Sequence, residues 1–169
     1  MNKTLYKIVG MLLLIPLFSA CNDTDDVAAI FTGKTWKLNY ITVDGGHEMF
    51  DFWGNEAGKR EQSFEELNKN GTYNIIFEGT VEGDIIKGNV NGTVITASTL
   101  TGTWTANGKD NSFQASVKGN DGGDILAKNF LEGLNAATSY EGDSNNLYLL
   151  YKPKSSKQTF RMAFRVVKQ

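Results

Sequence analysis

The chain has 169 residues, of which 17 are basic and 19 acidic, with one cysteine and one histidine. This is the size of one domain, and 40% of apolar residues is enough for a packed core. A single cysteine excludes an internal disulfide and a cysteine-rich zinc site, and a single histidine excludes a paired-histidine metal site. We therefore expect no metal centre and no cofactor.

Residues 1–20 have the features of a signal peptide. Lys3 and Lys7 give a positive start, and Ile8 to Phe18 form an apolar run that is shorter than the roughly 20 residues of a transmembrane helix. The sequence Leu-Phe-Ser-Ala-Cys at 17–21 resembles the bacterial lipobox. We predict that residues 1–20 are removed and that Cys21 is lipidated. The alternative, a secreted protein with a free thiol, leaves that thiol unexplained.

The stretch that follows Cys21 is acidic, with the sequence Asn-Asp-Thr-Asp-Asp. We interpret residues 21–31 as the lipidated cysteine and a flexible tether, and residues 32–169 as a single domain. Acidic residues behind a lipidated cysteine resemble the export signal of Bacteroidota surface lipoproteins. We predict a protein anchored by its lipid in the outer membrane, and we favour surface exposure over a domain that faces the periplasm.

The charge of the mature chain argues against nucleic acid as a partner. Removal of Lys3 and Lys7 changes the formal charge from −2 to about −4. A mildly acidic domain does not attract a phosphate backbone, and the sequence has no stripe of basic residues with interleaved aromatics. The predicted membrane contact is the lipid itself.

Alternation of apolar and polar residues predicts a mainly β domain with one packed helix. In the first strand, Thr35 to Val43, Trp36, Leu38 and Tyr40 alternate with polar residues. Asn-Gly pairs at 70/71, 91/92 and 107/108 are typical of tight turns and predict chain reversals there. The further expected strands are 73–77, 85–90, 93–99, 100–106, 113–117, 147–151 and 160–167.

One segment, residues 124–140, has helical rather than strand periodicity. Its apolar residues recur at steps of three and four, which predicts an amphipathic helix that packs on the sheet. Asp121 or Asp124 is positioned to cap its first turn, and Gly142 follows its end.

Two parts of the chain resemble the small lipocalin-like and META (HslJ-like) envelope lipoproteins. The first is the opening strand Gly-Lys-Thr-Trp-Lys-Leu at 33–38. The second is the C-terminal third, with Phe-Leu-Glu-Gly-Leu-Asn-Ala-Ala-Thr-Ser-Tyr at 130–140, Asn-Leu-Tyr-Leu at 146–149 and Phe-Arg at 164–165. The resemblance implies a small antiparallel β-barrel or half-barrel in the cell envelope, which in relatives is associated with stress tolerance.

The longest irregular stretch, residues 44–62, is the candidate ligand or partner surface. It brings His47, Phe50, Phe52 and Trp53 together in an otherwise polar segment. These side chains would form either the lip of a pocket or a plug that completes the core, and we favour the plug because small barrels need sealed ends. After it, Ser63 and Glu66 have the spacing of a capping box and suggest a short helix.

The sequence does not favour an enzyme. His47 is the only available imidazole base, and no serine lies in a Gly-x-Ser-x-Gly elbow. We expect a non-catalytic binding or accessory module with a small ligand, a glycan or an envelope protein as partner. The alternatives are a structural or stress-protective lipoprotein without a dedicated ligand and, third, a hydrolase that uses a carboxylate pair.

Overall fold

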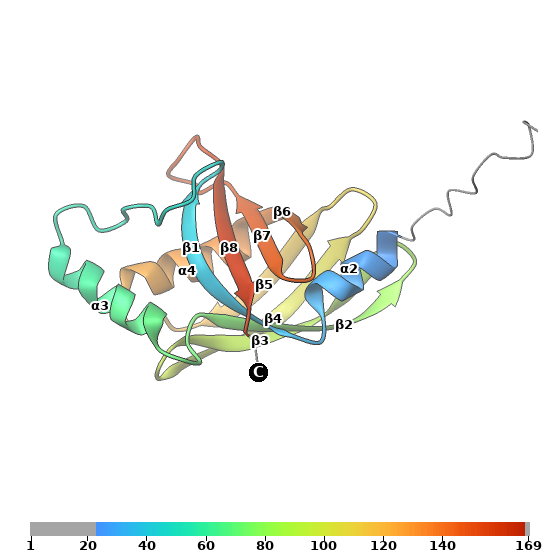
Figure 1. Ribbon diagram of the computed structural model, residues 1–169, viewed down its shortest axis with the longest axis horizontal. Coiled ribbons are helices and arrows are strands. Elements are labelled where there is room, and N and C mark those ends of the chain that lie inside the picture. Colours follow the sequence, from blue (N-terminus) through green and yellow to red (C-terminus); the bar gives the residue numbers. More distant parts are fainter. Residues whose placement is uncertain (1–22, 168–169) are drawn as a thin grey trace, which may run out of the picture.

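The computed structural model describes residues 23–167 (Figure 1). The predicted signal peptide and Cys21 lie outside these described residues. No helix within the described range is long and apolar enough to cross a membrane.

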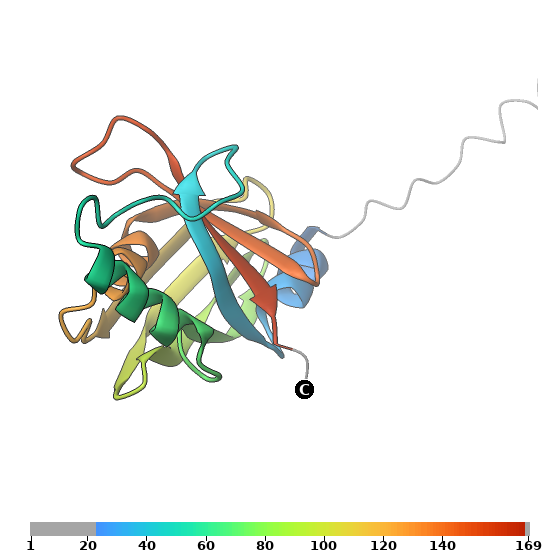
Figure 2. The same ribbon diagram turned by 60° about the vertical axis from the view of Figure 1, so that its left-hand side comes forward.

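Eight antiparallel strands form one sheet in the order β5-β4-β3-β2-β1-β8-β7-β6, which confirms the mainly β fold. The sheet curls into an open barrel, and its two edges are joined at one end by an isolated bridge between Ser112 and Ser139 (Figure 2). Beside this bridge the Tyr140 amide donates to the Asn111 carbonyl. The strands are β1 (Thr35–Val43), β2 (Asn74–Glu82), β3 (Ile85–Ile95), β4 (Ser98–Asn107), β5 (Phe113–Gly119), β6 (Ala137–Gly142), β7 (Asn146–Tyr151) and β8 (Phe160–Val166).

Aromatic side chains fill the barrel interior. The ring of Phe31 lies 4.8 Å from that of Trp104, 5.1 Å from that of Phe77 and 5.6 Å from that of Phe113. All four side chains are at most 3% exposed. Edge-on and stacked rings at these distances add to the stabilisation that burial itself gives.

Phe31 belongs to a helix that the sequence analysis did not predict. The segment interpreted as a flexible tether is the helix α2 (Asp23–Phe31), so that interpretation is wrong for residues 23–31. Val27 and Phe31 are buried, and α2 packs against β2, β3 and β4. Because these two apolar residues are four positions apart, they lie on one face of the helix and close one end of the barrel.

The predicted amphipathic helix exists but is shorter than expected. α4 (Ile125–Ala136) ends four residues before the expected boundary, and the chain continues directly into β6. Of the two predicted caps, Asp124 is the N-cap, and its carboxylate accepts a hydrogen bond from the Ala127 amide at 2.8 Å. The apolar face of α4 is fully buried, with Leu126, Phe130 and Leu134 at 0% exposure.

Of the three turns predicted from Asn-Gly pairs, one prediction is wrong. Asn107 ends β4 and Gly108 lies in the turn before β5, and Asn70-Gly71 lies in the turn before β2. Asn91 and Gly92, however, lie inside the continuous strand β3. A Cβ atom on Gly92 would come within 2.0 Å of the Asn74 carbonyl oxygen of β2. This glycine therefore permits a close approach of two strands rather than a turn.

The first strand has the predicted boundaries but not the predicted alternation. A β-bulge between Leu38 and Tyr40 shifts the register with β8, so Asn39 is an extra residue. As a result Ile41 replaces Tyr40 on the buried face, and Asn39 and Tyr40 both lie toward the outside. The bulge matters because it alters the surface that carries the candidate site.

The helix after the long loop is also longer than expected from the capping-box spacing of Ser63 and Glu66, which places its start at Ser63. α3 (Ala57–Asn68) begins six residues before Ser63, which lies in its interior with 0% exposure. Ser63 is therefore not a cap, and Glu56 occupies the N-cap position.

Candidate functional site

The aromatic residues of the long loop are distributed between core and surface. Trp53 is 4% exposed and belongs to the core, as the plug interpretation expects. Phe52 is half-buried and Phe50 is 38% exposed, and both rings contact Phe160 of β8. His47 is exposed. A role of these four residues in binding a ligand or partner stays a prediction.

Trp53 belongs to a buried polar network that joins the loop to both large helices. Its indole Nε1 donates to Ser63 Oγ at 3.0 Å, and Ser63 Oγ donates to Asp124 Oδ2 at 2.7 Å. The Tyr73 hydroxyl donates to Asp124 Oδ1 at 2.9 Å. Burial, with a further contribution from Asp124, raises the pKa of Tyr73 far above its ordinary value. Because Ser63 and Tyr73 are fully buried, this network serves folding rather than substrate binding.

Tyr73 itself holds an uncommon backbone conformation, with φ at +46°. In this conformation its amide donates to the Val94 carbonyl of β3, and its carbonyl accepts from the Leu38 amide of β1. The residue therefore links two strands at the point where β1 and β2 separate. A left-handed conformation costs about 1–2 kcal/mol for a residue with a side chain, and the Asp124 hydrogen bond helps to offset this cost.

The separation of β1 from β2 opens a groove of about 980 Å³ on the surface. The two strands pair only over Thr35–Lys37, and the end of α3 and the following turn lie across the gap. We call this feature the basic groove. Its lining residues come from β1, the end of α3, the turn after α3, the β6–β7 turn and the end of β8, and they are Lys37, Leu38, Asn39, Leu67, Asn68, Lys69, Asn70, Gly71, Asn145, Arg165, Val166 and Val167.

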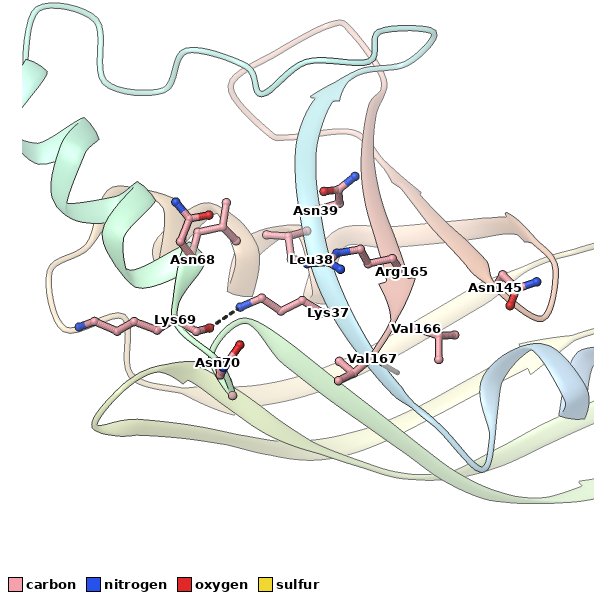
Figure 3. A pocket seen from close by; sticks show the side chains of 12 residues that line it. Lys37, Leu38, Asn39, Asn68, Lys69, Asn70, Asn145, Arg165, Val166 and Val167 are labelled. Carbon is pink, nitrogen blue, oxygen red and sulfur yellow. Dashed lines mark hydrogen bonds between the residues drawn. The ribbon is translucent and has the colours of Figure 1, made fainter. Parts of the chain in front are cut away.

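Lys37 forms one wall of the basic groove and is only 8% exposed. Its Nζ donates to the Lys69 carbonyl at 3.0 Å (Figure 3). It also donates to the carbonyl and hydroxyl oxygens of Thr72. Lys69 is the C-cap of α3, so the ammonium group also stabilises the negative end of the helix dipole. Burial, and then the nearby Arg165 cation, lower the pKa of Lys37 to about 8.

Arg165 is the second cation of the basic groove. It lies opposite Lys37 in the β1–β8 register, and in Figure 3 its side chain reaches from β8 toward β1. It is exposed, and among residues 23–167 no hydrogen bond or ion pair of its guanidinium group is found. The third cation, Lys69, forms an ion pair with Glu66. Lys37 and Arg165 are therefore the two cations of the groove without an ion pair in the described residues, and no carboxylate is among the lining residues.

The remaining polar groups of the basic groove are amides. Asn39, Asn68, Asn70 and Asn145 lie around the two cations and are all exposed. Each amide offers both donors and an acceptor to a ligand. No cluster of three or more His, Cys, Asp or Glu side chains that would hold a metal ion is found in the described part of the chain.

Sequence reasoning missed this groove. Alternation along the first strand placed Lys37 and Asn39 on a common polar face, but nothing local linked them to Asn70, Asn145 or Arg165. The pairing of β1 with β8 brings Arg165 beside Lys37, and the hydrogen bond from the Val166 amide to the Asn145 carbonyl holds the β6–β7 turn next to the end of β8.

Comparisons with known proteins give a family but no activity. A search of curated proteins found no match. The chain is similar to a DUF4847 family protein from Bacteroides vulgatus ATCC 8482, whose crystal structure at 1.00 Å superposes with a TM-score of 0.59 and 25% sequence identity. The match covers 85% of this chain and 99% of that chain. The family model described as a domain of unknown function, DUF4847, matches residues 22–166. The chain therefore belongs to the DUF4847 family.

Proposed function

We propose that this protein is a lipid-anchored lipoprotein of the cell envelope whose barrel is a non-catalytic binding module, with the basic groove as its binding site for an acidic saccharide. The observation that carries the binding proposal is the pair of cations, Lys37 and Arg165, in a groove without a lining carboxylate.

The proposed anchor is supported by the lipobox-like sequence that ends at Cys21. The Bacteroides origin of a similar structure agrees with a Bacteroidota-type leader, and we keep the outer membrane, with surface exposure favoured, as the proposed location. Membership of a lipocalin-like or META-like group belongs to the same proposal. Labelling cells with a fatty-acid analogue should tag the wild type and leave Cys21→Ala untagged. A tag on the variant would refute the anchor.

The chemistry of the groove selects the ligand class. A carboxylate beside Arg165 would accept charge-assisted hydrogen bonds from its guanidinium group. It would also offset the repulsion between Arg165 and the Lys37 ammonium, whose three donors are occupied by Lys69 and Thr72. The asparagine amides around them are suited to hydroxyl groups, which both donate and accept. A volume of about 980 Å³ is at the upper end of the range for small-molecule sites and exceeds what a single inorganic anion fills. Together these features favour an acidic saccharide.

Isothermal titration with three probes tests this proposal. We expect trigalacturonate to bind, and maltotriose and inorganic phosphate to bind at least ten times more weakly, because each lacks either the charge or the hydroxyl groups. Arg165→Gln should weaken trigalacturonate binding about tenfold, the loss of about 1.4 kcal/mol expected for one charge-assisted contact. Lys118→Gln removes an exposed cation that does not line the groove and serves as the matched control.

The binding results also distinguish an acidic-saccharide site from a simple anion site and from a site that recognises only the hydroxyl groups. Equal affinity for trigalacturonate and phosphate would indicate a simple anion site. Equal affinity for trigalacturonate and maltotriose would remove the role assigned to the cations. Identical losses in Arg165→Gln and Lys118→Gln would indicate a non-specific charge effect and would refute the groove as the site.

A structural or stress-protective role without a ligand is the second candidate. The aromatic packing around Phe31 fills the barrel interior, which argues against a ligand held inside the barrel. This candidate predicts that all three probes fail to bind, while loss of the protein still changes the envelope's resistance to stress.

A further inference from the structure

The first described helix begins very close to the predicted lipid anchor. α2 starts at Asp23, two residues after Cys21. Because an extended residue spans at most about 3.6 Å, the two residues of chain from a lipidated cysteine at position 21 to the start of α2 allow a reach of only about 7 Å. Phe31 is fully buried at the other end of this helix and holds it on the barrel. A lipid on Cys21 would therefore hold the end of the domain that carries α2 near the bilayer.

That same end of the domain carries an exposed apolar hairpin. β2 and β3 extend past the start of β1, and their connection lies beside the beginning of α2 in both views (Figures 1 and 2). We call residues 81–85 the hairpin tip. Val81 is 46% exposed and Ile85 is 42% exposed, among the highest values for large apolar side chains in the described residues.

The charges at the hairpin tip are partly compensated. Glu82 forms an ion pair with Lys87 at 2.6 Å, which reduces the repulsion that an acidic tip would meet at an anionic surface. The turn itself is fixed, because Gly83 has a φ of +62° and the Gly108 amide donates to the Asp84 carbonyl. Because Val81 pairs with Ile86 and Ile85 pairs with Glu82, the two aliphatic side chains lie on opposite faces of the hairpin. Both therefore meet a bilayer only when this supported turn points end-on toward it.

We propose that the hairpin tip contacts the surface of the lipid bilayer, with Val81 and Ile85 at the interface, when the protein is anchored through Cys21. This inference depends on the anchor that is part of the proposed function. It adds an orientation: the end of the barrel that α2 closes faces the membrane. Two aliphatic side chains are too few to bind a membrane alone, but they suffice to set an orientation once the lipid supplies the affinity.

Quenching by brominated lipid tests the orientation. The three native tryptophans, Trp36, Trp53 and Trp104, are at most 4% exposed, and their emission is measured in the wild type and subtracted as background. Val81→Trp adds a probe at the hairpin tip, Ile85→Trp is an independent second probe, and Lys154→Trp places a control on the exposed loop between β7 and β8, away from α2. Each full-length protein is anchored in vesicles of phosphatidylcholine and phosphatidylethanolamine, with and without bromine on the acyl chains.

We expect brominated vesicles to reduce the added emission of Val81→Trp and of Ile85→Trp, and to leave Lys154→Trp and the wild type unchanged. Equal quenching of all three probes, or quenching of none, would overturn the orientation. The anchor is checked separately from the mass of the purified protein. If Cys21 carries no lipid, the proposed anchor has failed, and a maleimide-bearing lipid attached to the Cys21 thiol then tests the orientation on its own.

Discussion

Asp124→Ala should be among the most damaging single substitutions on the polar side of the core. The carboxylate accepts hydrogen bonds from Tyr73, Ser63 and the Ala127 amide. Loss of the helix cap costs about 1 kcal/mol, and each buried hydroxyl donor left without its acceptor costs about 1–3 kcal/mol. Asp124 is half-buried, so water can partly replace the carboxylate, and the lower part of this range applies. We expect a loss of about 3–4 kcal/mol.

Urea denaturation followed by far-ultraviolet circular dichroism measures this loss. For a domain of this size, it corresponds to a fall in melting temperature on the order of 10 °C. Asp121→Ala is the matched control, because the Asp121 carboxylate accepts only a local hydrogen bond from the Gly123 amide. Asp124→Asn keeps an acceptor at the cap and should lose less than Asp124→Ala. If Asp124→Ala is no less stable than Asp121→Ala, the network does not hold the loop, α3, Tyr73 and α4 together as argued.

Four further outcomes are expected. Phe31→Ala should cost about 3–5 kcal/mol in denaturation because it empties the centre of the aromatic core; an unchanged midpoint would show that α2 is not docked. Gly92→Ala should destabilise the protein by more than about 1 kcal/mol, since its Cβ would meet the Asn74 carbonyl, whereas a neutral result would contradict the close strand approach. The folded protein has the raised pKa of Tyr73, so the unfolded chain releases this proton first, near pH 10, and stability should fall above that pH in the wild type more than in Tyr73→Phe. The opposite sign holds for Lys37: the folded protein releases its proton at about pH 8 and the unfolded chain near 10.5, so stability should rise between these values, and a rise that persists in Lys37→Met would exclude this residue as its source.

Local periodicity was sufficient for the elements that have one buried face. β1 has the predicted boundaries, and β7 and β8 differ from the predicted strands by one residue each, because alternating apolar residues point into one core. The end of α4 was misplaced for a physical reason. Ala137 and Tyr140 continue the helical spacing of Phe130 and Leu134. The chain nevertheless leaves the helix at this point, because pairing with β7 stabilises residues 137–140 more than a further turn of helix would.

The N-terminal helix shows where composition misleads. Three aspartates within residues 23–26 predicted a solvated tether, but Val27 and Phe31 have the spacing of one helix face and both are buried. The spacing was the available signal, and two apolar positions were too few to outweigh the charge pattern.

The candidate site lay beyond local reasoning altogether. The basic groove lies where β1 leaves β2, next to the bulge at Asn39 and the left-handed Tyr73. It also depends on the placement of the β6–β7 turn beside β8. These features are set by long-range pairing, and only the polar face of the first strand, with Lys37 and Asn39, was visible in the sequence.

The most direct test of the groove as a binding site is the ionisation of Lys37 with and without ligand. Nuclear magnetic resonance of a protein labelled with ¹³C at the lysine Cε positions follows this group through the titration. In the free protein the pKa of Lys37 is expected at about 8. Because a bound carboxylate favours the charged amine, saturating trigalacturonate should raise this pKa toward its ordinary value of about 10.4. A pKa that stays at about 8 with saturating saccharide would contradict the basic groove as the site of binding.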